Sequence, residues 1–249
     1  MTSDAQPARR LVGVGVGPGD PELVTLKAVR VLREADVVLV PVMGTGEPGR
    51  AEATVLAHVE ATRTRRVVFA LNERDDATRR EQAWDAAARS VAEAFEAGVG
   101  TVAFATLGDP NVYSTFTYLA ETVRGLVPEV VVETVPGVTA MQDLAARSGT
   151  VLAEGRESLA LLPLTAGLAT FENALAHFDS VVAYKGGRQM PDVLRVLREA
   201  GRLDGAVYGA ALGLDDEDVR PAADLPDAPA PYLSTVVVPA RRRARGGKL

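Results

Sequence analysis

The feature that most limits the possible folds is a glycine-rich turn between an apolar run and a helix-forming run. In "GVGVGPG" four glycines alternate with other residues, and "DPELVTLKAVRVLREA" follows immediately. In the second run apolar residues recur every three positions, as on one face of a helix: Leu23, Leu26, Val29 and Leu32. A β-branched strand, a tight glycine turn and a helix in this order are typical of an α/β protein.

The same alternation of strand and helix repeats along the chain. It breaks at "GLVPE" (residues 125–129), and a second series begins with the strand "VVVETVPG" (130–137). The acidic, proline-rich stretch 213–231 before the last strand is expected to be a loop or hairpin. The sequence therefore predicts two successive α/β domains, residues 1–127 and 128–249, each with its own sheet.

Composition excludes several classes of function. The 249 residues include no cysteine, so disulfides, thiolate metal sites and cysteine nucleophiles are absent. The two histidines, His58 and His177, do not suffice for a histidine-rich metal site and are expected to be ordinary helix residues. A net charge of -6 disfavours nucleic-acid and anionic-membrane partners. With no signal-like N-terminus and no apolar run near the roughly 18 residues of a membrane span, we expect a cytoplasmic protein.

The first glycine turn does not match the known phosphate-binding patterns. A dinucleotide fingerprint needs a third glycine, but counting from Gly13 places it at Pro18 and counting from Gly15 places it at Asp20. No Gly-Lys-Ser/Thr follows either. An acidic residue at the start of the helix suits an Asp20 N-cap with Pro21 in the first helical position. Two readings stay open: a tight turn without a ligand, or a site for a ligand with hydroxyls or positive charge.

Two further loops favour a ligand. "TLGDPNVYSTF" (106–116) and "TVPGVTAMQ" (134–142) also follow predicted strands and also contain glycine and proline. Loops at the carboxyl ends of strands are where open α/β sheets bind their ligands, and glycine lets the backbone approach a ligand closely.

The order of these blocks resembles the tetrapyrrole methylases, which transfer a methyl group from S-adenosylmethionine to precorrins and uroporphyrinogen. The similar blocks are "GVGPGDPELVTLKAVRVLREADVV", "GDPNVYSTF", "VPGVTAM", "VVAYKGG" and "YLSTVVV", and they span about Leu11 to Pro239. Within the family, "GDPNVYSTF" is most similar to the branch that methylates precorrin-2 at C20. The resemblance implies two α/β domains with S-adenosylmethionine in the cleft between them, and a homodimer.

Carried over by position, the resemblance implies a set of cofactor contacts from loops at strand ends. They are Pro18, Leu107, Gly108, Asp109, Val112, Tyr113, Thr139, Ala140, Tyr184, Lys185 and Leu212. Lys185 stands where relatives often have methionine, and we expect its ammonium to point away from the sulfonium. No metal of the protein's own is implied.

The substrate implied by the resemblance is precorrin-2 or its cobalt-containing counterpart, cobalt-factor II. Contacts to it are implied for Asp20, Arg50, Ser114 and Thr115, with Arg50 in a loop (43–53) over the cleft. The substrate's acetate and propionate arms suit arginine forks, for which the candidates are Arg50, Arg63, Arg65, Arg66, Arg79, Arg80 and Arg188.

The sequence assigns no residue as catalytic. Asp109 and Tyr113 lie nearest to the expected site and are candidates for the proton acceptor, although a role in loop structure and cofactor contact is favoured for both.

The alternative functions are those of another precorrin methylase, of a diphthine-type or ribosomal RNA methylase, and of an adenosine-ligand-binding protein without turnover. An RNA substrate fits poorly with the net charge and with only 5% aromatic residues.

Overall fold

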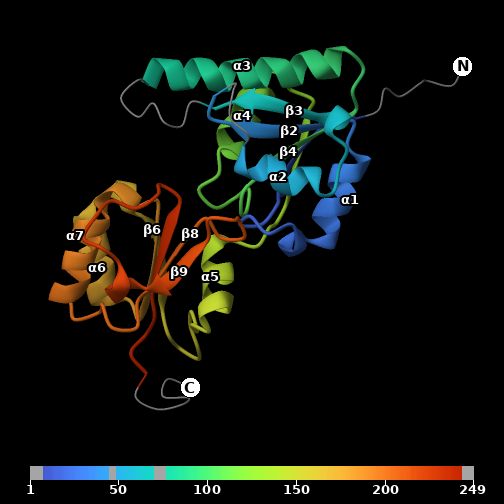
Figure 1. Ribbon diagram of the computed structural model, residues 1–249. Helices are drawn as coiled ribbons and strands as arrows, with labels where there is room; N and C mark the ends of the chain where they lie inside the picture. Colours follow the sequence, from blue (N-terminus) through green and yellow to red (C-terminus); the bar gives the residue numbers. More distant parts are fainter. Residues whose placement is uncertain (1–7, 45–48, 70–76, 243–249) are drawn as a thin grey trace, which may run out of the picture. The chain divides into compact units, whose positions relative to one another are not determined.

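The computed structural model describes residues 8–44, 49–69 and 77–242. The chain divides into two compact units, Met1–Thr139 and Ala140–Leu249. Each unit is built around its own five-stranded sheet (Figure 1). The predicted class, two successive α/β domains, is confirmed.

The first unit has a parallel sheet with the strand order β3-β2-β4-β1-β5. The strands are β1 (Arg10–Gly15), β2 (Val37–Val42), β3 (Thr64–Val68), β4 (Thr101–Thr106) and β5 (Val131–Val135). The helices are α1 (Leu26–Glu34), α2 (Arg50–Leu56), α3 (Ala77–Glu96) and α4 (Phe116–Leu126). Because all five strands run in the same direction, the loops that follow β1, β4 and β5 leave the same edge of the sheet.

Alternating side chains of the strands build two cores in this unit. Val37 and Leu39 pack with α3 and α4, whereas Val38 and Val40 pack with α1 and α2. Figure 1 shows α3 and α4 on one face of the sheet and α1 and α2 on the other. Both faces are covered, which explains why β2 and β4 read as continuous apolar runs.

The second unit has a mixed sheet with the order β6-β7-β10-β8-β9, in which only the pair β6–β7 is parallel. Its strands are β6 (Leu159–Pro163), β7 (Ser180–Tyr184), β8 (Val207–Ala210), β9 (Asp218–Pro221) and β10 (Ser234–Val238). The helices α6 (Leu168–His177) and α7 (Met190–Glu199) share a core with one face, and α5 (Ala140–Ser148) packs Leu144 over Gly209 of β8.

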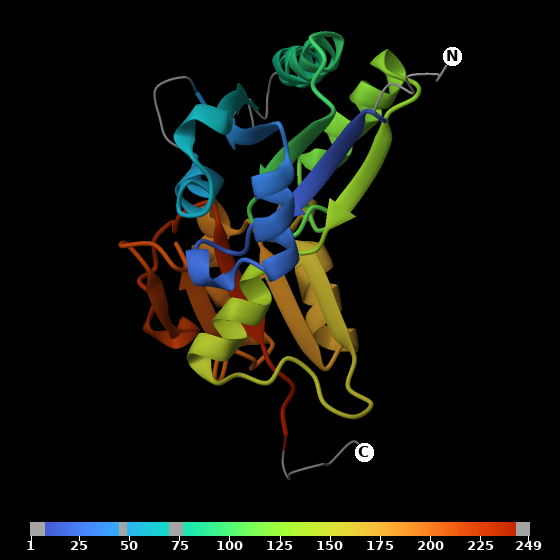
Figure 2. The same ribbon diagram turned by 90° about the vertical axis from the view of Figure 1, so that its right-hand side faces the viewer.

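The predicted domain junction is wrong by about one strand. We expected "VVVETVPG" to open the second domain, but β5 pairs with β1 at the edge of the first sheet (Figure 2), and the units divide after Thr139. The "GLVPE" break ends α4, and the chain then returns to the same sheet. Two ion pairs, Arg9–Glu129 and Arg10–Glu133, each at 2.6 Å, flank this pairing.

A smaller difference concerns a helix end. The helix expected over 51–60 ends at Leu56, so His58 follows α2 rather than lying in it, whereas His177 is the last residue of α6. The stretch expected as a loop or hairpin contains β9, whose antiparallel pairing with β8 forms a hairpin. Within the described ranges no helix is both long and apolar enough to cross a membrane. The same residues contain no group of three or more acidic or histidine side chains that could hold a metal ion.

Candidate functional site

Three glycine loops of the first unit meet at the carboxyl edge of its sheet. A Cβ atom added to Gly15 would lie 2.6 Å from the carbonyl oxygen of Gly108 and 2.6 Å from the amide nitrogen of Gly137. One added to Gly137 would lie 2.2 Å from the same oxygen of Gly108. No side chain fits at these contacts, so close backbone packing requires glycine at Gly15, the last residue of β1, and at Gly137 after β5.

The first two loops are also joined by hydrogen bonds. The amide of Gly108 donates to the carbonyl of Gly17 at 2.7 Å, and the amide of Val16 donates to Thr106 at 3.0 Å. Gly17 and Gly108 both have positive φ angles, 77° and 72°, which other residues adopt at a cost. Pro18, a predicted cofactor contact, is buried directly after this bridge.

The carboxylate of Asp109 fixes the second and third loops to each other. Its Oδ2 accepts a hydrogen bond from the amide of Gly137 at 3.0 Å, and its Oδ1 accepts one from Asn111 at 2.8 Å. The Asn111 side chain in turn donates to Thr134 at 3.3 Å. Since both oxygens accept backbone hydrogen bonds, this geometry favours the structural role for Asp109 over that of a free proton acceptor.

Ser114 and Thr115, two predicted substrate contacts, lie where this loop enters α4. The Ser114 hydroxyl is 2.8 Å from the hydroxyl of Thr106 and accepts from the amide of Phe116 at 3.1 Å. Thr115 is the N-cap residue of α4 but its side chain makes no capping hydrogen bond. The Ser114 hydroxyl is thus already bonded on two sides, whereas that of Thr115 is not used by the cap.

Left-handed backbone conformations occur at strand ends near the predicted cofactor residues. Among the described residues other than glycine, only Tyr113, Lys185 and Ala211 have positive φ, at 49°, 61° and 50°. Tyr113 precedes α4 in the loop after β4, and the other two directly follow β7 and β8. Such strain persists where the surrounding structure imposes it, and it is concentrated at functional sites. Tyr113 and Lys185 are among the predicted cofactor contacts, whereas Ala211 is not, because the sequence carries no signal for it.

In the second unit, α5 brings the remaining predicted cofactor residues close to one another. The Tyr184 hydroxyl accepts a hydrogen bond from the amide of Met141 at 2.9 Å, in the first turn of α5. Ala140 begins the same helix. A Cβ on Gly209 would contact both Leu144 of α5 at 2.7 Å and Leu212 at 3.1 Å. Ala140 therefore begins α5, Tyr184 bonds to its first turn, and Leu212 lies beside Gly209, against which the helix packs.

Burial raises the pKa values of two tyrosines. Desolvation raises the pKa of the Tyr113 phenol, which is therefore neutral at physiological pH and suited to donate a hydrogen bond. Desolvation likewise raises the pKa of Tyr208, whose hydroxyl lies 3.1 Å from that of Ser234. A raised phenol pKa disfavours Tyr113 as an ionised base at neutral pH.

Arg63 and Arg66, two candidate substrate arginines, make contacts that support the fold. The Arg63 guanidinium donates to the carbonyls of Arg33, at 2.8 Å, and Ala35 at the end of α1. The Arg66 guanidinium pairs with buried Glu52 at 2.8 Å. Arg50, the predicted substrate contact, is the exposed first residue of α2. Part of the loop expected around it, residues 45–48, lies outside the described residues.

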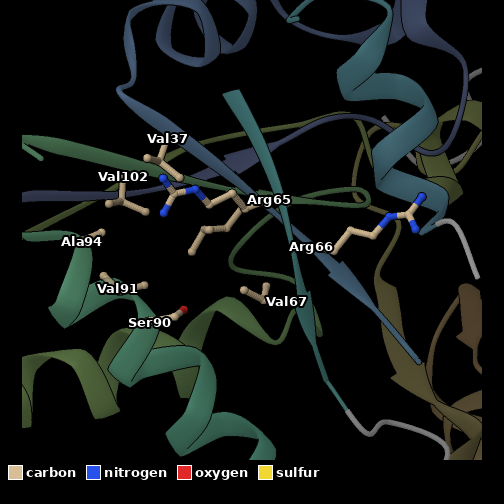
Figure 3. A pocket seen from close by; sticks show the side chains of 9 residues that line it. Val37, Arg65, Arg66, Val67, Ser90, Val91, Ala94 and Val102 are labelled. Atoms are coloured by element: carbon tan, nitrogen blue, oxygen red, sulfur yellow. The ribbon is translucent and has the colours of Figure 1, made fainter. Parts of the chain in front are cut away.

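A small cavity lies in the first unit away from these loops (Figure 3). Its volume is about 100 Å³, below the roughly 300 Å³ of a small-molecule pocket. It is lined by residues of β2, β3, β4 and α3, including the strand-starting pair Val37 and Val102. Arg65 reaches over the aliphatic side chains, whereas Arg66 points away from them (Figure 3). Because it borders the starts of β2 and β4 rather than their carboxyl ends, we do not assign the cofactor to it.

Comparison with known proteins identifies the family. The sequence profile of the tetrapyrrole (corrin/porphyrin) methylases matches residues 10–227. The chain belongs to this family. The profile covers all three glycine loops and most of the second unit, so the predicted resemblance is confirmed.

Two curated relatives of this methylase match it over nearly their whole length. The precorrin-2 C(20)-methyltransferase of Sinorhizobium sp is 35% identical over 237 residues, which are 92% of this chain and 95% of that protein. The cobalt-precorrin-2 C(20)-methyltransferase of Salmonella typhimurium is 33% identical over 234 residues, with the same two shares.

A solved structure supports the fold. The uroporphyrin-III C-methyl transferase of Thermus thermophilus, complexed with S-adenyl homocysteine, has a TM-score of 0.61 and 24% identity. The match covers 92% of this chain and 96% of that structure. At this identity the likeness bears on the fold of the methylase, not on its ligand.

Proposed function

We propose that this methylase transfers the methyl group of S-adenosylmethionine to C20 of precorrin-2, giving precorrin-3A in cobalamin biosynthesis. The observation that carries the proposal is the 35% identity to the Sinorhizobium enzyme along nearly the full length of both chains. The cobalt-containing substrate is the second candidate, supported by 33% identity to the Salmonella enzyme. No described residue distinguishes a metal-free macrocycle from one with cobalt at its centre.

The residues present fit S-adenosylmethionine as the cofactor. When bound, it supplies a methyl group on a positively charged sulfonium, which a nucleophilic carbon can displace. The first-unit loops present glycine backbone and Pro18 rather than cationic side chains, which suits a positively charged group. A ligand can approach the backbone closely at Gly108, where an added Cβ would meet no atom closer than 4.0 Å.

The same proposal assigns the cofactor contacts by residue. In the first unit they are Pro18, Leu107, Gly108, Asp109, Val112, Tyr113 and Thr139; in the second they are Ala140, Tyr184, Lys185 and Leu212. Asp109 takes part through loop geometry, since its carboxylate oxygens bond to Gly137 and Asn111. We keep Asp20, Arg50, Ser114 and Thr115 as proposed substrate contacts.

The chain contributes to the reaction chiefly by holding the two reactants in line and away from water. Rigid, hydrogen-bonded loops suit this task because they need little rearrangement when the reactants bind. The neutral phenol of Tyr113 can orient a polar group through a hydrogen bond.

A methyl-transfer assay tests the proposal. The purified chain is incubated anaerobically with S-adenosylmethionine and enzymatically generated precorrin-2, and in parallel with the cobalt-loaded form. We expect a trimethylated product from one of the two. Methylation of neither, but of uroporphyrinogen III or of RNA, would overturn the assignment in favour of another methylase. Binding of S-adenosylhomocysteine without transfer to any substrate would favour the adenosine-binding alternative.

A homodimer and a cytoplasmic location belong to the same proposal and rest on the sequence analysis. Light scattering after size-exclusion chromatography tests the first, and cell fractionation tests the second. A monomer at assay concentration would contradict the proposed dimer.

A further inference from the structure

We propose that helix α2 and the turn after it hold the first glycine loop in its working shape, with Thr54 and His58 as positioning residues. The inference rests on the proposed function in one respect, that the loop around Pro18 contacts the cofactor. The sequence alone indicates no role for Thr54 and predicts that His58 is an ordinary helix residue.

The loop is held through alternate carbonyl groups. The carbonyl of Gly17 accepts a hydrogen bond from the amide of Gly108 at 2.7 Å. Two residues further on, the carbonyl of Gly19 accepts a hydrogen bond from the Thr54 hydroxyl at 3.0 Å. The carbonyl of Pro21 accepts one from His58 Nε2 at 2.9 Å. Since a carbonyl can only accept, Nε2 of His58 must carry the proton. Three different segments thus fix three carbonyls within five residues.

Thr54 is completely buried, and so is its hydrogen bond to the carbonyl of Gly19. Its exposed fraction is 0%, and the hydrogen bond to Gly19 is buried as well. Without this hydroxyl the Gly19 carbonyl would lose its partner where water does not replace it easily. A buried polar group left without a partner is costly, and this cost favours a local opening of the loop.

His58 is in turn fixed to α1. The Arg33 side chain donates to the carbonyl of His58 at 3.1 Å, and Arg63 donates to the carbonyl of Arg33 at 2.8 Å. The imidazole that reaches Pro21 therefore projects from a backbone that two arginines tie to the end of α1. The contact joins the start of the short 3-10 helix Pro21–Leu23 to the end of α2.

The composition of the loop explains why it needs outside support. Between β1 and α1 it contains Gly17 and Gly19, which have no side chains to pack, and Gly17 has a φ of 77°. Glycine loses more conformational freedom on ordering than any other residue. A loop ordered in advance by Thr54 and His58 spares a ligand that entropic loss. Pro18 lies between two of the fixed carbonyls, so its position follows directly from them.

The test compares Thr54→Val with Thr54→Ser in the full-length chain. Valine keeps the shape but removes the hydroxyl, whereas serine retains it. The matched control is Thr122→Val, which removes an exposed threonine hydroxyl bonded to Tyr118 at 3.0 Å on α4. The first readout is hydrogen exchange of the backbone amides between Gly13 and Leu26. The second is the dissociation constant of S-adenosylhomocysteine by calorimetry.

We expect Thr54→Val to speed hydrogen exchange in this segment about tenfold and to raise the dissociation constant of S-adenosylhomocysteine about tenfold. Thr54→Ser should restore both, and Thr122→Val should change neither. His58→Leu and His58→Gln form a second pair, because the glutamine amide can still donate to Pro21. Unchanged exchange in both Thr54→Val and His58→Leu would overturn the proposal, as would equally faster exchange in every peptide of the chain.

The exchange readout separates this inference from the proposed function. It needs no tetrapyrrole substrate and no turnover. If the wild-type chain fails to methylate precorrin-2 while Thr54→Val still loosens the loop, the positioning role stands and the function assignment fails. If the loop loosens but the affinity for S-adenosylhomocysteine is unchanged, the loop does not contact the cofactor and the positioning role for binding is overturned.

Discussion

At the scale of single residues, the three glycine loops depend on two features. The glycines have no side chain and so allow close backbone contacts, and a few polar side chains each make two hydrogen bonds. Gly15 and Gly137 allow backbone contacts that a Cβ atom would block. Asp109 joins two of the loops with the two oxygens of one carboxylate. These residues lie within the segments predicted from the sequence, and the structure supplies the physical reason for each.

The substitution Gly137→Ala should disrupt the loop contact. Its Cβ would lie 2.2 Å from the carbonyl oxygen of Gly108, and because that oxygen belongs to the backbone the loops must move apart. We expect a loss of about 1–3 kcal/mol in the free energy of unfolding and weaker binding of S-adenosylhomocysteine. Urea denaturation and calorimetry measure the two effects.

Gly125→Ala is the matched control for this experiment. A Cβ there meets nothing within 4 Å, and the residue lies inside α4. Gly125 lies in the last turn of the helix, where alanine should stabilise the fold by at most about 0.5–1 kcal/mol and leave ligand binding unchanged. Equal stability of the two variants would contradict the packing explanation.

The substitution Asp109→Asn separates a positioning role from proton transfer. In asparagine an NH2 group replaces one of the two carboxylate oxygens, so the amide of either Gly137 or Asn111 would face a donor instead of an acceptor. We expect about tenfold weaker binding of S-adenosylhomocysteine. Asp192→Asn, at an exposed pair with Arg195, should have no effect. A Asp109→Asn variant that binds normally but has lost turnover would instead assign the proton acceptor to Asp109.

These residues could be predicted from the sequence because the three loops carry short motifs that follow one another in a fixed order. It located the three loops and named Gly108, Asp109 and Tyr113 within them. It could not predict the hydrogen bond between Asp109 and Gly137, since the partners are 28 positions apart and nothing local links them. The positive φ of Ala211 was missed for a related reason, because alanine carries no turn preference.

At the scale of helices and strands, the assignment of elements from periodicity was largely right, but the assignment of β5 to a sheet was not. A strand's own sequence indicates that it is buried or exposed, not which neighbour it pairs with. The helix break before β5 resembles a linker, and only the ladder from Arg10–Val131 to Val14–Val135 shows otherwise. Both flanking ion pairs include exposed carboxylates, and such pairs contribute roughly 0–1 kcal/mol each, so the backbone ladder is the main link.

The segment after β10 provides a pH prediction within the second unit. Arg242 donates to Glu157 at 3.0 Å, and this hydrogen bond lowers the pKa of the Glu157 carboxyl from its ordinary 4.5. A carboxyl whose pKa is lower in the folded state than in the unfolded state stabilises the fold. This stability is present above a pH of about 4.5 and is lost as the pH falls through the folded-state pKa. The wild type should therefore lose stability in acid more steeply than Arg242→Met.

Urea denaturation of both proteins between about pH 6 and pH 3 measures this difference. The gap between wild type and Arg242→Met should be largest near neutral pH and should close in acid. Arg195→Met, at an exposed pair on α7, is the control and should track the wild type. A gap that stays constant down to the lowest pH would contradict the linkage.

At the scale of the whole molecule, the sequence predicted the architecture and the family, and the comparisons confirmed both. Two α/β units of this kind place glycine loops at strand ends, where a ligand can contact the backbone. With a net charge of -6, we expect recognition of an anionic tetrapyrrole to depend on local arginines rather than on the overall field. Of the candidates, Arg63 and Arg66 have structural partners, whereas Arg50 is exposed at the start of α2.

The substitution Arg50→Met tests that assignment at the level of the substrate. Removal of a guanidinium that pairs with a carboxylate arm should raise KM for the tetrapyrrole about tenfold or more, with little change in the affinity for S-adenosylhomocysteine. Arg188→Met, another exposed candidate, serves for comparison. An unchanged KM in Arg50→Met would remove Arg50 from the substrate site.

The most direct test of the central claim is to locate the transferred methyl group. The wild-type chain is supplied with S-adenosylmethionine labelled in its methyl carbon and with precorrin-2 or its cobalt form, and the product is analysed by nuclear magnetic resonance. The account predicts that a single labelled methyl group is attached at C20. A label at any other carbon of the macrocycle would contradict it.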